Sequence, residues 1–255
     1  ILSGVTEALG EAGYSVVVAD AGTEGERQIK LFNELLARRV DGLVLATASR
    51  SDPLVDRTLE TGVPTVLVNR AESGNRVASV VSDDGEGMRL AVEHLLERGH
   101  RSIGHIAGPP NLSTGFLRRR GLEASLAAHS LSPVATTIAR AFSREEGRLA
   151  CLALLDKTCR ATAIVAANDL LAMGAYEALR ERGLNCPADI SIVGHNDMPL
   201  VDMIDPPLTT VRIRHRTMGR EAARLLLSQM QDDDTPVQSI VLTPELIVRR
   251  STRQL

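Results

Sequence analysis

The stretch "AIVAANDLLAMGAYEALRERGL", residues 163–184, passes from an apolar run directly into a pattern of helical period. Asn168 or Asp169 stands where a helix N-cap is expected, and Gly183 stands where a left-handed residue closes a helix. A second apolar run, "ISIVG" at 190–194, follows within a few residues. The stretch therefore predicts a strand, a crossover helix and a second, parallel strand.

The same alternation of apolar runs and amphipathic stretches recurs along the chain. Further predicted strands are "YSVVVA" (14–19), "GLVLAT" (42–47), "TVLVN" (65–69), "ASVV" (78–81) and "SIGHIAG" (102–108). These runs are almost uninterruptedly apolar, as is typical of parallel strands whose two faces are both covered by helices. The pattern predicts an α/β fold.

Length and composition limit the classes of function. A chain of 255 residues with 44% hydrophobic content is large enough for two lobes or one large α/β unit. A formal net charge of −3 gives no electrostatic footprint for nucleic acid. Apolar runs fall far below the ~20 residues of a membrane span, and no export signal is visible. Cys151, Cys159 and Cys186 lack C-x-x-C spacing, which fits a reducing cytoplasm with buried thiols.

Signatures of catalysis and of metal binding are weak. No phosphate-binding loop occurs, and Asn111 replaces the first glycine that a nucleophile elbow needs. The spacing of His94, His100 and His105 does not place them on one helical face, so they are expected to be surface or helix-terminal histidines. We therefore expect no catalytic residue, no metal and no cofactor.

The segment "GHNDMPLVDMIDPP", residues 194–207, holds the strongest alternative. Its histidine and acids could form a metal or catalytic cluster, and His195 with Asp197 could act as an acid–base pair. Asp202 and Asp205 precede a proline pair, however, where short acids favour turns. Ligand positioning and turn formation explain the segment without chemistry.

Three asparagines follow three predicted strands: Asn69, Asn168 and Asn196. The carboxyl ends of parallel strands line the ligand crevice of an open α/β sheet. A carboxamide offers donors and an acceptor without charge, which suits sugar hydroxyls or the amide edges of small metabolites. Each asparagine could equally be a helix cap, Asn168 above all.

Several longer segments, in order and spacing, resemble the ligand-binding core of the lactose-repressor/galactose-repressor family of bacterial transcription regulators. They are "DDGEGMRLAVEHLLERGHRSIGHIAGPP" (83–110), "LRRRGLEASL" (117–126), "AIVAANDLLAMGAYEALRERGL" (163–184), "PADISIVGHNDMPLVDMIDPPLTTVR" (187–212) and "PELIVRRST" (244–252). The resemblance covers essentially the whole chain and implies two similar three-layer Rossmann-like subdomains with parallel sheets. It implies an effector cleft between them and three chain crossovers. The implied N-terminal subdomain comprises residues 1–81 plus 213–238, and the C-terminal subdomain residues 82–212 plus 239–255.

The resemblance also implies the effector-binding positions. They are Asn69, Arg118, Phe142, Asn168, Asn196 and Asp197. The planar fork of Arg118 suits bidentate contact with effector oxygens, and we expect this arginine to be exposed in the cleft, so that its removal barely changes stability. Phe142 falls where the family places an aromatic that stacks on the effector. A solvated surface arginine and a packed core phenylalanine are the alternatives for these two residues.

The implied function is that of a non-enzymatic sensor: the effector-binding and dimerisation core of a transcriptional repressor in the cytoplasm, not associated with a membrane. The small-molecule effector is expected to be a sugar or sugar derivative, and the homodimer to use the helices in "GMRLAVEHLL" (87–96) and "DPLVDRTLETG" (52–62). Operator DNA would be contacted only through an N-terminal helix-turn-helix domain, which the family places, with its first strand, before "ILSGV". The alternative is a periplasmic sugar-binding protein of a transport system.

Overall fold

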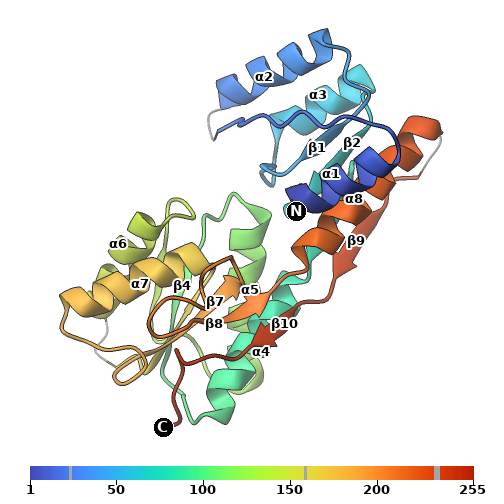
Figure 1. Ribbon diagram of the computed structural model, residues 1–255. Coiled ribbons are helices and arrows are strands. Elements are labelled where there is room, and N and C mark those ends of the chain that lie inside the picture. Colours follow the sequence, from blue (N-terminus) through green and yellow to red (C-terminus); the bar gives the residue numbers. More distant parts are fainter. Residues whose placement is uncertain (23–24, 158–159, 233–235) are drawn as a thin grey trace. The chain divides into compact units, whose positions relative to one another are not determined.

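A computed structural model describes residues 1–22, 25–157, 160–232 and 236–255 (Figure 1). The chain divides into two compact units, each described here by itself. The first unit contains residues 1–82, 111–113 and 214–242, and the second contains residues 83–110, 114–213 and 243–255. Cys159 lies outside the described residues, whereas Cys151 is buried.

The first unit is built on a parallel sheet of four strands in the order β1-β2-β3-β9. Its strands are β1 (Leu43–Leu45), β2 (Thr65–Val68), β3 (Ala78–Ser82) and β9 (Ser239–Leu242). Its helices are α1 (Leu2–Glu11), α2 (Gly25–Ala37), α3 (Pro53–Thr61) and α8 (His215–Gln231).

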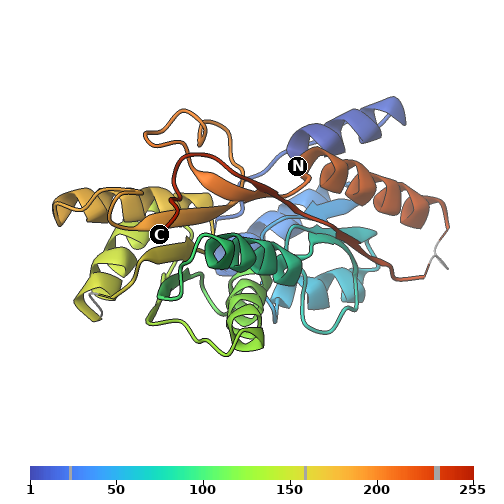
Figure 2. The same cartoon turned by 90° about the horizontal axis from the view of Figure 1, so that it is seen from below.

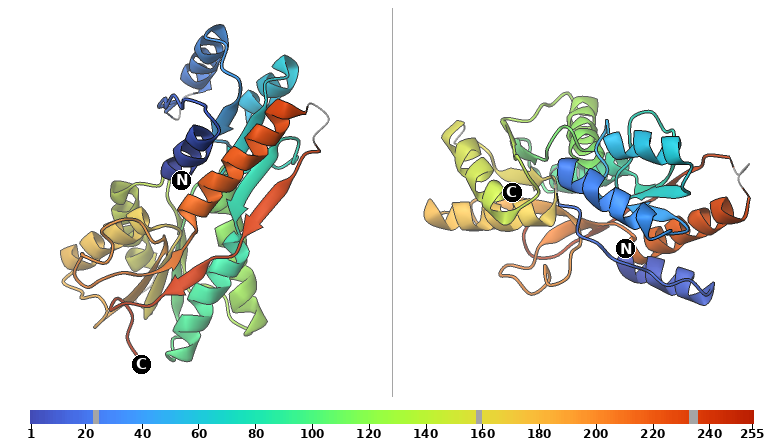
Figure 3. Two further views of the ribbon diagram at one scale, coloured as in Figure 1. Left: turned by 45° about the vertical axis from the view of Figure 1, so that its right-hand side comes forward. Right: turned by 90° about the horizontal axis from the view of Figure 1, so that it is seen from above.

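Neighbouring side chains of β1 point to opposite faces of this sheet. Val44 packs with α1 and α8, whereas Leu43 and Leu45 pack with α2 and α3. The helices α1 and α8 lie side by side (Figures 1 and 3). Their close approach requires Gly4, because a Cβ there would lie 2.1 Å from the Arg216 carbonyl oxygen. The first unit therefore has helices on both faces of its sheet.

The second unit is built on six strands in the order β10-β8-β7-β6-β4-β5, of which only β10 is antiparallel to its neighbour. The strands are β4 (Ile103–Ala107), β5 (Thr136–Ile138), β6 (Ala163–Ala166), β7 (Ser191–Asn196), β8 (Thr209–Arg212) and β10 (Glu245–Ile247). The helices are α4 (Asp84–Glu97), α5 (Ser113–Ala128), α6 (Arg144–Lys157) and α7 (Asp169–Glu181).

The core of the second unit also has two faces. Ile164 of β6 packs in a cluster with residues of α6 and α7, whereas Val165 packs in a separate cluster with residues of α4 and α5. Figure 2 shows α4 and α5 apart from the adjacent helices α6 and α7. The predicted α/β fold with parallel strands between helical layers is confirmed.

Three expectations from the sequence require correction. Residues 14–19 do not form a strand, because no described strand lies beside them to complete a ladder. Residues 239–242 belong to the first unit rather than the C-terminal one, because β9 pairs with β3. The side chains of Met88, Ala91, Val92 and Leu95 on α4 are not available for a dimerisation face, because they are buried within their own unit, and the use of α3 in the dimer stays a prediction. No helix among the described residues could cross a membrane.

Candidate functional site

The carboxyl ends of β6 and β7 lie at one edge of the second sheet, because these strands are parallel neighbours. Asn168 follows β6 by two residues, Asn196 is the last residue of β7, and Asp197 comes next. The fold thus brings three of the predicted residues to the same edge.

Arg118, on α5, is buried, with only 2% of its surface exposed. Its Nε donates to Asp84 Oδ1 over 2.7 Å, and its Nη1 donates to the carbonyl oxygen of Ala167 over 2.7 Å. The expectation of an exposed arginine is therefore wrong. Arg118 joins the first turn of α4 to the loop after β6, and among the described residues its Nη2 has no hydrogen-bond partner.

Asp84 is the buried counter-ion of Arg118. Burial raises the pKa of this carboxyl, and the Arg118 guanidinium acts in the opposite direction. The Nε2 atom of His195, on β7, lies 3.7 Å from Asp84 Oδ1, which is too long for a hydrogen bond. The buried side chains of Arg118, Asp84 and His195 therefore lie close together within the second unit.

Asp169, the first residue of α7, fixes the loop after β7. Its Oδ1 accepts a hydrogen bond from Thr210 Oγ1 over 2.6 Å, and its Oδ2 accepts one from the Met198 amide over 2.8 Å. Burial raises the pKa of Asp169 to about 6, although both hydrogen bonds oppose the shift. Asp169 thus ties α7, β8 and the loop after β7 together.

Asn168 caps α7. Its Oδ1 accepts the amide hydrogen of Leu171 over 2.9 Å, so the helix-cap interpretation is confirmed. The oxygen is occupied by the helix, and the Nδ2 group donates to no other described residue.

Asn196 and Asp197 both have left-handed backbone, with φ of 116° and 52°. The Oδ1 atom of Asn196 is buried and has no hydrogen-bond partner among the described residues. The two carboxylate oxygens of Asp197 are occupied, because Arg212 Nε and Arg249 Nη2 each lie 2.7 Å away. A buried acceptor without a partner is costly unless a bound molecule supplies a donor.

Phe142 and Asn69 complete the predicted set. The Phe142 ring packs beside Gly108, directly after β4, where an added Cβ would lie 2.4 Å from Phe142 Cζ. Asn69 follows β2 in the first unit with a φ of 68°, and its backbone amide donates to the Val80 carbonyl. The effector-binding roles of all six residues stay predictions.

One prediction about the histidines requires correction, and one alternative loses its support. His94 lies in the last turn of α4, as expected of a helix-terminal residue, but His94, His100 and His105 are all buried rather than on the surface. Their partners include Thr252, Thr162 and the Val165 carbonyl. The alternative of an acid–base pair between His195 and Asp197 finds no support, since the oxygens of Asp197 are held by arginines while His195 Nε2 faces Asp84. Among residues that the structure describes, no group of three or more His, Cys, Asp or Glu side chains could hold a metal.

Sequence reasoning missed Asp84 and Asp169, which organise this sheet edge. Each stands at the start of the helix that follows a strand, β3 or β6. Acids at that position are expected for helix capping alone, so the pattern carries no separate signal for a buried role. Their partners, Arg118 and Thr210, are 34 and 41 residues away in the sequence.

The comparisons with known proteins agree with this geometry. Residues 92–252 match the family described as periplasmic binding protein-like domain. An HTH-type transcriptional regulator of Streptomyces limosus is 37% identical over 98% of this chain and 73% of its own length. CelR of Thermobifida fusca is 35% identical over 98% of this chain and 74% of its own length.

Solved structures show the same similarity. A complex of the transcriptional regulator CelR with cellobiose superposes with a TM-score of 0.92 at 34% identity, over 98% of this chain and 77% of that one. A lac repressor dimer bound to operator and an anti-inducer superposes with a TM-score of 0.87 at 29% identity, over 99% of this chain and 88% of that one.

Proposed function

This chain belongs to the lactose-repressor/galactose-repressor family of transcription regulators, and we propose that it binds a sugar-like effector at the carboxyl edge of its second sheet. It is the effector-binding core of a regulator that transmits this binding to an N-terminal DNA-binding domain. Relatives of the same family are named as helix-turn-helix regulators, which favours this role over that of a transport-system component.

The proposal rests on polar atoms at the sheet edge that have no hydrogen-bond partner among the described residues. Asn196 Oδ1 is a buried acceptor without a partner, and Arg118 Nη2 and Asn168 Nδ2 are donors not used within the described residues. Hydrogen bonds to Asp84, Ala167 and Leu171 hold Arg118 and Asn168 in position, and Asn196 is the last residue of β7. A fixed acceptor and two fixed donors match sugar hydroxyls, which both donate and accept hydrogen bonds. The similarity to the CelR–cellobiose complex supports a sugar as the ligand class.

Effector binding shifts the populations of the regulator's conformations. It can do so only because the effector binds one conformation more tightly than another. The chain acts as a homodimer, and operator DNA is contacted by the DNA-binding domain, as in the similar lac repressor dimer bound to operator. We place the protein in the cytoplasm, because its relatives act on transcription. Its relatives are named as transcription regulators, which supports a role without catalysis.

The test begins with calorimetric titration of cellobiose, other disaccharides, monosaccharides and purines into the purified chain. The ligand that binds is then titrated into Asn196→Gly, which removes the open acceptor while glycine accepts the positive φ. Asn75→Gly is the matched control, because Asn75 is exposed and has a φ of 50°.

We expect the dissociation constant of Asn196→Gly to rise roughly tenfold, the ~1.4 kcal/mol of one hydrogen bond, and that of Asn75→Gly to stay unchanged. Equal affinity in both variants would remove Asn196 from the site. Binding of a purine and of no sugar would overturn the proposed ligand class.

A further inference from the structure

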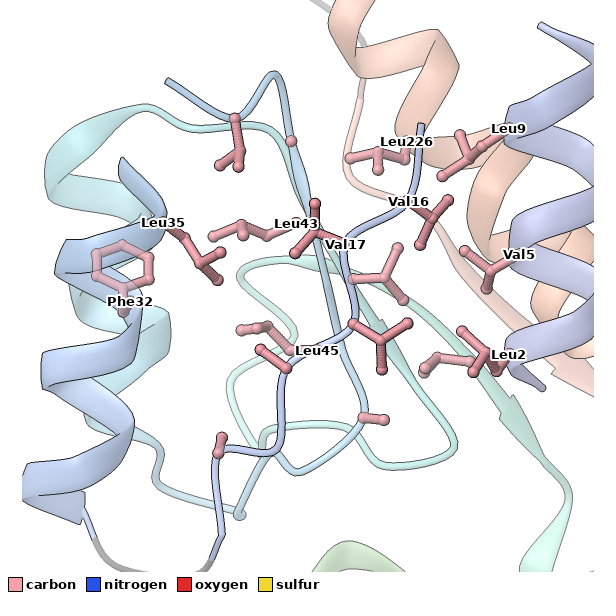
Figure 4. Close-up of a pocket in the computed structure, with 18 of the residues that line it drawn as sticks. Leu2, Val5, Leu9, Val16, Val17, Phe32, Leu35, Leu43, Leu45 and Leu226 are labelled. Atoms are coloured by element: carbon pink, nitrogen blue, oxygen red, sulfur yellow. The ribbon is translucent and has the colours of Figure 1, made fainter. Parts of the chain in front are cut away.

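The first unit contains a cavity of about 490 Å³ that is lined mostly by apolar side chains (Figure 4). They include Leu9 of α1, Phe32 of α2 and Leu43 of β1. This lining does not suit a sugar, because a hydroxyl that is buried without a hydrogen-bond partner costs free energy. Binding of a sugar-like effector therefore depends on the polar side chains at the carboxyl edge of the second sheet, and on what holds them in place.

The turn that follows β7 has an unusual backbone. Asn196 and Asp197 have φ of 116° and 52°, a region that residues other than glycine rarely adopt. Such conformations persist only where the surrounding structure holds them. The Oδ1 atom of Asn196, which has no hydrogen-bond partner among the described residues, extends from this turn. Its position therefore depends on the contacts that hold Asp197.

The carboxylate of Asp197 ties the turn to two arginines. Its Oδ2 accepts a hydrogen bond from Arg212 Nε over 2.7 Å, and its Oδ1 lies 2.7 Å from Arg249 Nη2. The Asp197 side chain is only 9% exposed, so water competes little for these contacts. Each oxygen thus has a charged partner within the protein, which makes the carboxylate an anchor for the turn.

Arg249 is the more enclosed of the two arginines, with its side chain 17% exposed against 44% for Arg212. Its Nη1 donates to the Leu208 carbonyl oxygen over 2.8 Å, and its backbone amide donates to Thr209 Oγ1 over 2.9 Å. These acceptors lie at the start of β8, so the sheet fixes Arg249 at both its backbone and its side chain. A solvent-screened ion pair is worth less than an enclosed one, so Arg249 holds Asp197 more strongly than Arg212 does.

We propose that Arg249, assisted by Arg212, is a positioning residue for the effector site: through Asp197 it fixes the turn from which the Asn196 carboxamide meets the effector. This role rests on the proposed function, because it takes Asn196 as the contact with a sugar hydroxyl. The family resemblance implies that Asp197 contacts the effector directly. Here its carboxylate acts on the turn instead, and Arg249 acts through that carboxylate.

The first test needs no ligand. NMR relaxation compares the turn in the wild type and in Arg249→Gln, which keeps a polar side chain but loses the charge that holds Asp197. We expect the order parameter of the Asp197 amide to fall from the ~0.85 of rigid backbone toward ~0.6. Arg148→Gln is the matched control, because Arg148 lies in the same unit, is 25% exposed and pairs with Glu145 and Glu181. The control should leave the turn rigid, and a rigid turn in Arg249→Gln would overturn the proposal.

The second test separates positioning from a merely structural role. Cellobiose is titrated calorimetrically into Arg249→Gln, Asn196→Gly and the double variant. Arg249→Gln should weaken binding about fivefold in the wild-type background and leave it unchanged in the Asn196→Gly background, because coupled residues do not contribute additively. Urea unfolding should show the same loss of stability in both backgrounds. Arg249→Lys, which keeps the charge, should restore part of the affinity.

Different outcomes bear on the effector site and on Arg249. Unchanged affinity in Asn196→Gly would remove Asn196 from the site and would overturn both. Weaker binding in Asn196→Gly, with unchanged binding in Arg249→Gln, would overturn only the role of Arg249. An equal loss of affinity from Arg249→Gln in both backgrounds would mean that Arg249 does not act through Asn196, and it would overturn that role as well.

Discussion

Replacing Arg118 by methionine tests the buried ion pair of the second unit. The substitution keeps an unbranched side chain of similar length but removes the charge that faces Asp84 and the hydrogen bond to the Ala167 carbonyl. Both side chains of the pair are at most 5% exposed, so water cannot replace the lost partner. Breaking a buried pair in this way costs about 3 to 5 kcal/mol, because an uncompensated charge is left inside the protein.

The loss should depend on pH in a defined direction. Burial raises the pKa of Asp84, and without the arginine nothing of comparable strength opposes that shift. A raised pKa means that the folded state holds its proton more tightly than the unfolded state does, so stability falls as pH rises through the folded pKa. The deficit of Arg118→Met should therefore be largest at neutral pH and should shrink on acidification.

Urea unfolding followed by circular dichroism measures the effect. The matched variants are Arg119→Met, which removes a half-exposed arginine paired with Glu123 and should cost less than about 1 kcal/mol, and the double variant Arg118→Met with Asp84→Leu. The double variant should recover most of the loss, because it leaves no unpaired charge. A deficit in Arg118→Met no larger than that of Arg119→Met, at every pH, would refute the argument.

Three further outcomes are expected. The pKa of Asp169 is about 6 in the folded protein, above its ordinary value of 3.8. Acidification from about pH 7 to pH 5 should therefore stabilise the wild type relative to Asp169→Asn by about 1 kcal/mol, as measured by urea unfolding. A change of opposite sign would contradict this assignment. Metal analysis of the purified protein should find no stoichiometric transition metal, and a melting temperature that falls with chelator would disprove the turn interpretation of residues 194–207. Sedimentation at micromolar concentration should give a species near twice 27.4 kDa, and a strictly monomeric protein would count for the periplasmic alternative.

Features that depend on near neighbours in the chain were predictable from the sequence. The N-cap at Asn168 and the left-handed Gly183 lie where the local pattern places them, with a φ of 68° for the glycine. The alternation of apolar runs with helical patterns predicted the α/β fold. Caps and hydrophobic periodicity are properties of a few adjacent residues, so no tertiary contact is needed to recognise them.

Only the tertiary structure decided the environment of each polar residue at the sheet edge. Arg118 has the sequence context of a surface arginine, between Leu117 and Arg119, but it is buried because Asp84 and the Ala167 carbonyl receive its donors. Asp197 has the context of a ligand-binding carboxylate, yet two arginines from other strands and loops hold it.

The segment 14–19 shows the same limit from the opposite direction. Its residues favour a strand, but a strand exists only when a neighbour supplies the other half of each hydrogen bond. The sequence by itself determined the order and type of the elements, because those follow from local periodicity and capping. Which side chains are paired, buried or left open followed only from the folded chain, because residues tens of positions apart must first be brought together before burial and charge can act on them.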